Sequence, residues 1–289
     1  MQTVAANGYM IIEAHVINED NQLSFETNLV LTDYIPIGFR YKMRRFDPMD
    51  NPSLFYEFAC INPASHEEIV AFANKYGYLG KSVFIVLPKK DFKRKNLKNT
   101  FPVAERFGET LLARGEPIGV WRREILDMNR AFELLTLIQK ADRERLSQLI
   151  FWEDGRVVYK IEGGRSELIA SNEPSFSGRT LGLTLKQLQP QSYVQPARSL
   201  LLRWINRKLQ DNSVFTSLRT TPDFKKVEFG LGSHSLLGVM WYQLARAFTS
   251  EGMVSVCVEC GRAFQSQRVS ARYCSERCKK RAYRARKRS

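Results

Sequence analysis

Four cysteines near the C-terminus have a spacing that suits metal binding. Cys257 and Cys260 form a C-x2-C pair, and Cys274 and Cys278 form a C-x3-C pair after thirteen intervening residues. Two short cysteine pairs on separate turns can supply the four soft ligands of a tetrahedral zinc ion. None of the chain's three histidines lies near this cluster. We therefore expect an all-thiolate, structural zinc site with no open coordination position for catalysis.

The residues around the cysteines predict a specific order of elements. The first pair predicts a tight knuckle, and Gly261 behind it can adopt a positive φ. The stretch between the pairs is long enough for a hairpin, with Phe264 and Tyr273 as packing residues. Cys274 and Cys278 are four positions apart, so they would share one face in the first turn of a helix. Knuckle, hairpin and helix in this order are typical of a treble-clef finger.

The cysteines have two alternative interpretations: they could form two disulfides, or they could be four unreactive thiols. Disulfides require an oxidising compartment, which a protein usually reaches by means of a signal peptide. Residues 1–8 do not resemble one, because they are uncharged and contain no apolar run of sufficient length. The fifth cysteine, Cys60, lies alone in an apolar run, as expected of a buried free thiol. These features favour zinc binding in a reducing cytoplasm.

A basic segment follows the last cysteine pair. Residues 275–289 contain no Gly or Pro and are rich in Ala, Lys and Arg, which predicts a helix. Ser275 is the expected N-cap, and Glu276 suits the first turn. A thin stripe of Cys278, Ala282 and Ala285 would face the metal and the hairpin.

The cations of this helix are candidate nucleic-acid contacts. Several of them fall on one stripe at helical spacing, and Tyr283 lies close by for an aromatic contact. The candidate residues are Arg277, Lys280, Arg281, Arg284, Lys287 and Arg288. The alternative is a solvated basic tail that only aids solubility.

The charge distribution places the polyanion contact in the same region. The chain has a net charge of +14, and residues 251–289 carry +8 of it from eleven Lys or Arg side chains and three acids. Such an asymmetry points to a nucleic-acid partner at the C-terminus. A second basic segment, residues 89–98, is predicted to be a mobile loop.

The rest of the chain predicts an α+β body. With 289 residues and 44% hydrophobic content, the chain can bury a full core, and no apolar stretch approaches the length of a membrane span. We expect a body over residues 1–250, with a candidate subdivision near residues 110–116, and a finger over residues 253–289. The expected strands are residues 9–16, 54–61, 156–162, 165–170 and 227–229. Gly163-Gly164 is the expected two-residue turn of a hairpin between residues 156–162 and 165–170. The expected helices are residues 66–76, 117–150, 197–209 and 236–248, the last capped by Ser233. Two of them have clear apolar faces: Ile69, Phe72, Ala73 and Tyr76 in the first, and Leu200, Leu201, Trp204 and Ile205 in the third.

Motifs for catalysis are incomplete. The segment beginning at His66 has Val70 where a metalloprotease helix needs its second histidine. Residues 230–235 resemble a Gly-rich phosphate loop but are explained by a strand-to-helix turn, and His234 there is interpreted as a surface residue. An active site assembled from residues distant in sequence stays open.

Two stretches together resemble bacterial proteins that carry a C-terminal zinc finger. Residues 72–80 (FANKYGYLG) are similar to a segment of their bodies, and the two cysteine pairs with residues 281–287 (RAYRARK) are similar to CGNR-type fingers of bacterial transcription regulators. In this chain Lys279-Lys280-Arg281 follows Cys278, where those fingers have Gly-Asn-Arg. The resemblance implies a DNA-binding regulator whose body senses a ligand or mediates assembly.

Taken together, these features predict a zinc-finger protein of the bacterial cytoplasm that binds nucleic acid, DNA in preference to RNA. A homo-oligomer is compatible with the same features, and no membrane partner is expected. One alternative is a protein-interaction module whose finger is structural. Another is an enzyme that acts on nucleic acid, with its site in the body.

Overall fold

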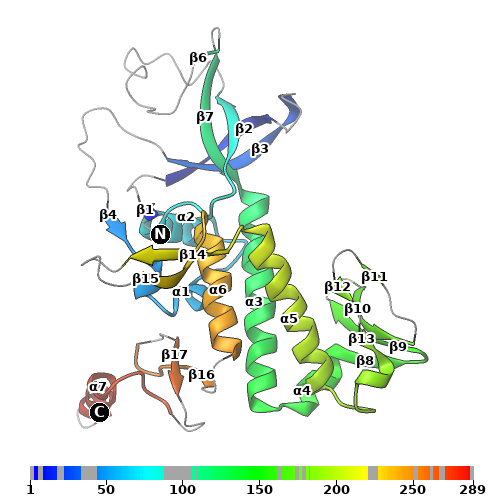
Figure 1. The fold of residues 1–289 in the computed structure, drawn as a ribbon. Coiled ribbons are helices and arrows are strands. Elements are labelled where there is room, and N and C mark those ends of the chain that lie inside the picture. Colours follow the sequence, from blue (N-terminus) through cyan, green and yellow to red (C-terminus); the bar gives the residue numbers. More distant parts are fainter. Residues whose placement is uncertain are drawn as a thin grey trace. The chain divides into compact units, whose positions relative to one another are not determined.

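The structure is a computed structural model, and helices and small sheets make up its described part (Figure 1). It describes residues 3–5, 9–17, 23–33, 44–87, 106–107, 110–161, 164–172, 176–177, 180–181, 183–220, 227–249, 253–260, 263–266 and 271–286. This content confirms the predicted α+β class. None of the helices within these ranges is both long and apolar enough to cross a bilayer.

The chain divides into two compact units. Unit 1 combines Met1–Met128 with Asn212–Gln243, and unit 2 combines Asn129–Asp211 with Leu244–Ser289. The divisions fall inside two helices, α3 (Ile118–Lys140) and α6 (Leu236–Thr249). The boundary expected between residues 250 and 253 stays a prediction.

The main sheet of unit 1 is antiparallel and has the strand order β3-β2-β5-β7-β6. Because β3 also pairs with β7, the strands β2, β3, β5 and β7 form a closed ring. The strand expected over residues 9–16 is confirmed as β2. The bounds are β2 (Tyr9–Ile17), β3 (Leu23–Asp33), β5 (Val83–Leu87), β6 (Arg106–Phe107) and β7 (Thr110–Pro117).

Unit 1 also contains two separate strand pairs. They are β1 (Thr3–Ala5) with β4 (Arg44–Phe46), and β14 (Phe215–Thr220) with β15 (Val227–Gly232). The strand expected at residues 227–229 is confirmed within β15. The basic segment at residues 89–98 lies outside the described residues.

The helices of unit 1 include α2 (His66–Tyr76), which confirms the helix expected there. Its N-cap is Ser65, whose Oγ accepts a hydrogen bond from the Glu68 N–H at 3.2 Å. It ends at Gly77, which has a φ of 90°. The predicted apolar face of Ile69, Phe72, Ala73 and Tyr76 is buried.

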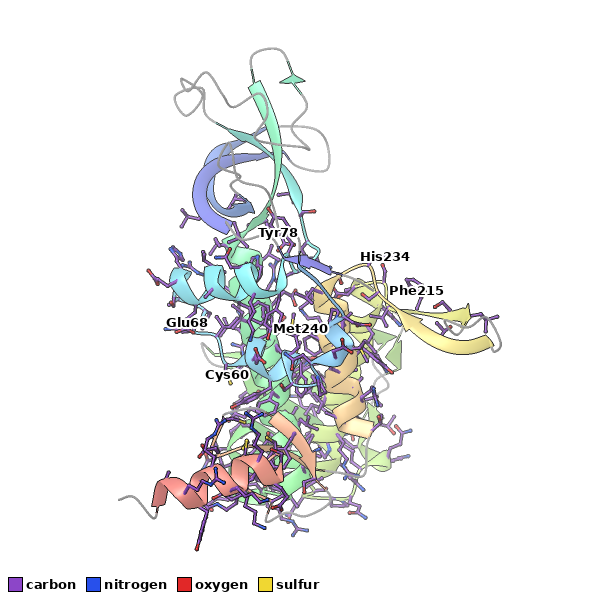
Figure 2. All side chains as sticks on the ribbon, turned by 90° about the vertical axis from the view of Figure 1, so that its left-hand side faces the viewer. Cys60, Glu68, Tyr78, Phe215, His234 and Met240 are labelled. Carbon is purple, nitrogen blue, oxygen red and sulfur yellow. The ribbon has the colours of Figure 1, made fainter. Side chains whose placement is uncertain are left out.

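The strand expected over residues 54–61 is wrong, because this segment forms helix α1 (Leu54–Ala59) after a short 3-10 turn, η1 (Pro48–Asp50). The buried side chains are Leu54, Phe55, Phe58 and Ala59. This spacing follows helical periodicity, whereas a half-buried strand would bury alternate residues. Cys60 follows the helix and is exposed, so the expectation of a buried thiol is also wrong (Figure 2).

Aromatic rings fill the centre of unit 1. Phe58 lies 5.2 Å from Phe72 and 6.1 Å from Trp121, measured between ring centroids. Phe72 also contacts Tyr76, at 4.7 Å. These tilted contacts add to the burial of large apolar surfaces and join α1, α2 and α3 in one core.

The buried amide of Gln243 joins α6 to the start of α1. Its Nε2 donates to the carbonyl oxygens of Pro48 and Asn51, both at 2.9 Å. Its Oε1 accepts from the Phe55 N–H at 3.3 Å. Burial of this polar group is tolerated because its hydrogen-bonding groups find partners.

Unit 2 contains a sheet with the strand order β13-β10-β9-β8. The hairpin expected around Gly164 is confirmed, since β9 and β10 pair with Arg165 opposite Ile161. The strands are β8 (Ile150–Glu153), β9 (Arg156–Ile161), β10 (Arg165–Ser171) and β13 (Leu183–Thr184). A separate pair joins β11 (Phe176–Ser177) and β12 (Thr180–Leu181), and a 3-10 turn, η4 (Leu185–Gln187), follows β13.

The helix α5 (Val194–Asp211) contains the helix expected over residues 197–209. Its predicted apolar side is buried, namely Leu200, Leu201, Trp204 and Ile205. Trp204 also packs edge-on against Tyr159 of β9 at 5.3 Å and donates from its Nε1 to a Glu167 carboxylate oxygen at 2.8 Å.

The single helix expected over residues 117–150 is wrong in its extent. It breaks after α3, at Ala141, and a second helix, α4 (Arg143–Leu149), follows before β8. The Ala141 N–H bonds to the Ile138 carbonyl and the Asp142 N–H to the Leu137 carbonyl, which is the Schellman pattern of a helix end. Asp142 then caps α4 by accepting from the Arg145 N–H.

Candidate metal centre and basic helix

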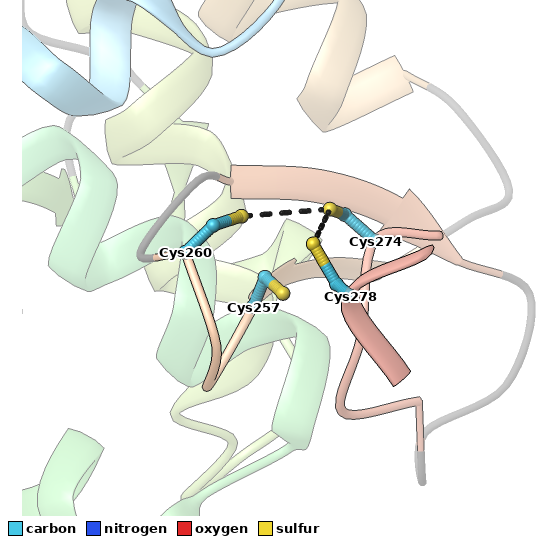
Figure 3. Close-up of side chains that lie close together, drawn as sticks. All are labelled: Cys257, Cys260, Cys274 and Cys278. Atoms are coloured by element: carbon cyan, nitrogen blue, oxygen red, sulfur yellow. Dashed lines mark hydrogen bonds between the residues drawn. The ribbon is translucent and has the colours of Figure 1, made fainter. Parts of the chain in front are cut away.

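The four C-terminal cysteines meet in space, as their spacing predicts (Figure 3). Cys257 and Cys260 lie in the turn between β16 (Met253–Val256) and β17 (Ala263–Ser266). Cys274 and Cys278 lie at the start of α7 (Glu276–Arg286). All four sulfur atoms lie within 4.8 Å of one another. The cluster could hold a metal ion.

The position of the hairpin and the first residue of the helix differ from the expectation. The hairpin begins before the first cysteine pair, at Met253, so the knuckle is its turn and does not precede it. Cys274 precedes the helix, and only Cys278 lies in its first turn. Cys274 lies outside the helix because the N-cap residue, Ser275, follows it. The Ser275 Oγ accepts from the Cys278 N–H at 3.3 Å, as expected of an N-cap.

One backbone contact joins the two halves of the cluster. The Val258 N–H, inside the knuckle, donates to the Arg272 carbonyl at 3.0 Å, two residues before Cys274. The expected packing residues Phe264 and Tyr273 are both half-buried. This hydrogen bond and the partly buried side chains together hold the knuckle next to the segment before Cys274.

The sulfur–sulfur distances exclude disulfides in this arrangement. Cys274 Sγ lies 3.6 Å from both Cys260 Sγ and Cys278 Sγ (Figure 3). A disulfide bond is about 2.05 Å long, and the cysteines are free thiols. Cys257 and Cys278 are buried, Cys274 is half-buried and Cys260 is exposed, so one edge of the cluster faces solvent.

The electrostatics of the cluster favour a thiolate at Cys257. Burial opposes its ionisation, but backbone N–H groups of Cys274, Cys260 and Glu259 point at its sulfur and lower its pKa to about 6. Burial and the three neighbouring thiols raise the pKa of Cys274 to about 12. Crowded sulfur atoms resist successive ionisation unless a cation lies among them.

The helix α7 exposes its cations. The nominated residues Arg277, Lys280, Arg281 and Arg284 are exposed, and Lys287 and Arg288 lie outside the described residues. Cys278 and Ala282 are buried, which confirms two members of the predicted inner stripe. The third, Ala285, is exposed, so the predicted stripe is wrong at this position. Tyr283 is also 61% exposed.

Two ion pairs involve the flanks of this helix. Arg281 Nε lies 3.8 Å from a carboxylate oxygen of Glu259 in the knuckle. Lys279 Nζ lies 3.5 Å from Glu276 one turn earlier. Sequence reasoning missed Glu259 and Lys279. The available signal was that Glu259 is the one charged residue between the first two cysteines.

The histidines considered for catalysis have other surroundings. His66 Nε2 lies 2.9 Å from Arg122 Nη2, at the start of α2. His234 is exposed and packs on the Phe215 ring with centroids 5.0 Å apart (Figure 2). The strand-to-helix turn expected at residues 230–235 is confirmed, but Ser235 and not Ser233 caps α6, since Ser235 Oγ accepts from the Gly238 N–H at 2.9 Å.

A buried carboxylate fixes the loop after α2, and sequence reasoning did not find it. Glu116 accepts hydrogen bonds from the N–H groups of Leu79, Gly80 and Lys81 at 2.9, 2.7 and 2.6 Å. Burial raises its pKa, although these N–H groups favour the charged form. A side chain at Gly80 would place its Cβ 2.4 Å from the Cβ of Ser235. The loop is closed by packing, so we assign it a structural role.

Comparisons with known proteins give no match: neither a family model, nor a curated protein sequence, nor a solved structure matches the chain.

Proposed function

We propose that residues 253–289 form a four-cysteine zinc finger whose basic helix binds nucleic acid, with DNA preferred to RNA. In this proposal the protein is a bacterial, cytoplasmic DNA-binding regulator, and its body senses a ligand or mediates assembly. The observation that carries the proposal is the cluster of four sulfur atoms from which an exposed, cation-rich helix starts.

The choice of zinc rests on the chemistry and spacing of the ligands. Thiolates are soft ligands, and four of them in a tetrahedron suit zinc. A zinc–sulfur distance of about 2.3 Å gives a sulfur–sulfur edge of about 3.8 Å. Cys274 Sγ lies 3.6 Å from two of the other sulfur atoms, and all four lie within 4.8 Å of one another, so a small inward shift would fit the ion. Zinc held by four thiolates is closed to substrate, so its contribution would be to hold the knuckle against the start of α7.

The support for nucleic acid is the direction in which the charges point. Cys278 joins the helix to the metal cluster, and Arg277, Lys280, Arg281 and Arg284 leave the same helix toward solvent. A free basic tail would scatter its charges, whereas this helix would present them as a unit to a phosphate backbone. Phosphate contacts by Lys and Arg release counterions, which makes the affinity depend steeply on salt.

The test is binding of labelled duplex DNA, single strands and RNA over a range of salt concentrations. Replacing both Arg281 and Arg284 by Ala should weaken binding to all sequences. It should flatten the log–log salt dependence by about two units if both side chains contact phosphate, since each contact contributes roughly 0.9 on duplex DNA.

A matched control is Arg123→Ala with Arg207→Ala, which removes the same charge from exposed positions of α3 and α5. This control should leave the affinity unchanged. Equal binding by the Arg281/Arg284 variant with its metal still in place would remove α7 from the proposal. Absence of binding by the unaltered protein would favour an interaction module with a structural finger.

A further inference from the structure

The exposed side chains of α7 flank its buried side unequally, with three arginines on one side and Lys279, Glu276 and Tyr283 on the other. At about 100° per residue, the midpoint between Cys278 and Ala282 marks the buried side, and Lys280 lies directly opposite. Arg281 and Lys279 lie about 80° from the buried side, one on each flank. Arg277 and Arg284 lie between Lys280 and the Arg281 flank. The helix thus has Lys280 at its crest, three arginines on one side, and on the other side Lys279 beside the acid Glu276.

We propose that α7 enters the major groove of duplex DNA, where Lys280 contacts the base edges and selects guanine. Arg281 and Lys279 contact the phosphates on the two walls of the groove. This inference rests on the proposed function and names its substrate, double-stranded DNA with a preferred guanine.

The dimensions of the helix fit this groove. With side chains, an α-helix is about 10–12 Å wide, and the major groove of B-DNA is about 12 Å wide. The eleven residues of α7 span about 16 Å, enough to pass several base pairs. In such a position, the crest of the helix faces the base edges and the flanks face the backbones. The major groove of A-form RNA is too narrow for a helix, so the geometry favours DNA.

The chemistry of the crest residue indicates the base. Guanine presents two acceptors in the major groove, O6 and N7, and Lys or Arg is their commonest partner. Lys280 is exposed at the crest and can donate to both. On the flanks, Arg281 and Lys279 face carboxylates at 3.8 and 3.5 Å while their side chains are 59% and 63% exposed. The Lys279–Glu276 pair is exposed at both ends and is weak. The Glu259 side chain is only 19% exposed, but its 3.8 Å contact with Arg281 is long, so both cations can turn to phosphates.

Two adjacent lysines provide a matched test. Lys280→Ala and Lys279→Ala each remove one positive charge from neighbouring positions of the same helix. The full-length, metal-loaded variants and the unaltered protein would each select sites from a randomised duplex library, followed by titration of the preferred site and of single-base changes in it.

We expect the unaltered protein to prefer guanine at one position by about tenfold or more. Lys280→Ala should abolish that preference and leave the salt dependence nearly unchanged. Lys279→Ala should keep the preference, weaken binding to all sequences and lower the salt slope by about 0.9. Metal content and circular dichroism verify that both variants keep the finger intact.

Several results would overturn the inference. They are binding without sequence preference, an equal effect of the two lysine variants, and tighter binding to single strands or RNA than to duplex DNA. Each of these leaves nucleic-acid binding by the finger standing, although tighter binding to RNA would also contradict the proposed preference for DNA. If the unaltered protein binds no nucleic acid at all, the proposed function fails and this inference fails with it.

Discussion

Glu57 is a residue whose charge is stabilised by several neighbours at once. Lys75 Nζ lies 2.8 Å from its carboxylate, the Tyr76 hydroxyl donates to it at 2.5 Å, and the Asn51 amide donates at 3.0 Å. Burial alone would raise the pKa of Glu57, but these three donors outweigh it and lower the pKa below its ordinary value of 4.5. The group therefore links α1 to the end of α2 more strongly when it is ionised than when it is neutral.

This arrangement predicts a pH-dependent contribution to stability. Because the folded-state pKa is lowered, the unfolded chain takes up the proton first on acidification. The contribution is complete above the unfolded pKa near 4.5 and is lost as the pH falls through the folded-state pKa. Glu57→Gln should lower the free energy of unfolding by about 1 kcal/mol at neutral pH and have less effect in acid.

Urea unfolding at a series of pH values would measure this effect. The matched control is Glu133→Gln, which removes an exposed carboxylate paired with Arg145 at 2.9 Å. An exposed pair of this kind contributes little. A Glu57→Gln effect that is no larger than the control, or that is constant with pH, would contradict the prediction.

At the scale of elements, the break between α3 and α4 contains a strained residue. Ala141 is exposed and has a φ of 50°, in the left-handed region that disfavours a side chain. Glycine is the usual residue at this position of a Schellman motif. Ala141→Gly should therefore raise the free energy of unfolding by roughly 1 kcal/mol, although glycine gains more entropy in the unfolded chain.

The same substitution inside a helix provides the control. Ala71 is exposed on α2, where glycine should lower the free energy of unfolding by about 0.5–1 kcal/mol. Opposite signs for the two variants in denaturant unfolding would confirm the strain at Ala141. A loss of stability at both positions would contradict it.

Elements with complete local signals could be predicted from the sequence. Helix α2 has a serine cap, a regular apolar face and Gly77 at its end, and the hairpin at Gly164 has a turn residue between two alternating strands. Helix α1 was misread because its short apolar run suits a strand or a buried helix equally. The end of α3 at Ala141 could not be predicted, because no glycine or proline stands there to indicate a helix end.

The candidate site shows the same division. The meeting of the four cysteines could be predicted, because metal chemistry demands given residue types at fixed spacing. The contact between Arg281 and Glu259 could not, since it depends on how the knuckle and helix meet in three dimensions. The contacts of Glu116 could not be predicted either. Its three N–H partners belong to a loop far from it in the chain, and nearly every residue type has a backbone N–H, so the sequence does not indicate which ones bind it.

At the scale of the whole molecule, the excess positive charge and the cysteine cluster both lie at the C-terminal end of the chain. Residues 251–289 carry +8 of the net +14 and all four clustered cysteines. The body carries the buried aromatic and aliphatic side chains that form a core of its own, around Trp121 in unit 1 and Trp204 in unit 2. This distribution suggests that the finger depends on metal for its folding while the body depends on packing.

The last prediction separates these two sources of stability. Cys274→Ser removes a central ligand, since its sulfur lies 3.6 Å from two others. The purified protein should contain about one zinc per chain, and this variant should lose it, because a finger with so small a core folds only with its metal. The backbone amide hydrogens of α7 and of the hairpin β16–β17 should then exchange rapidly with solvent, while those of α2, α3 and α5 stay protected.

The controls are Cys60→Ser and a chain from which residues 253–289 are deleted. Cys60 is a free cysteine outside the cluster, so its replacement should change neither zinc content nor exchange. The deleted chain should remain in solution and unfold cooperatively in urea, with the same transition as Cys274→Ser, because both retain the packed body. If both chains aggregate or lose cooperativity, the finger holds the body together and its principal role is structural. If Cys274→Ser keeps its zinc, the four-thiolate site itself is wrong.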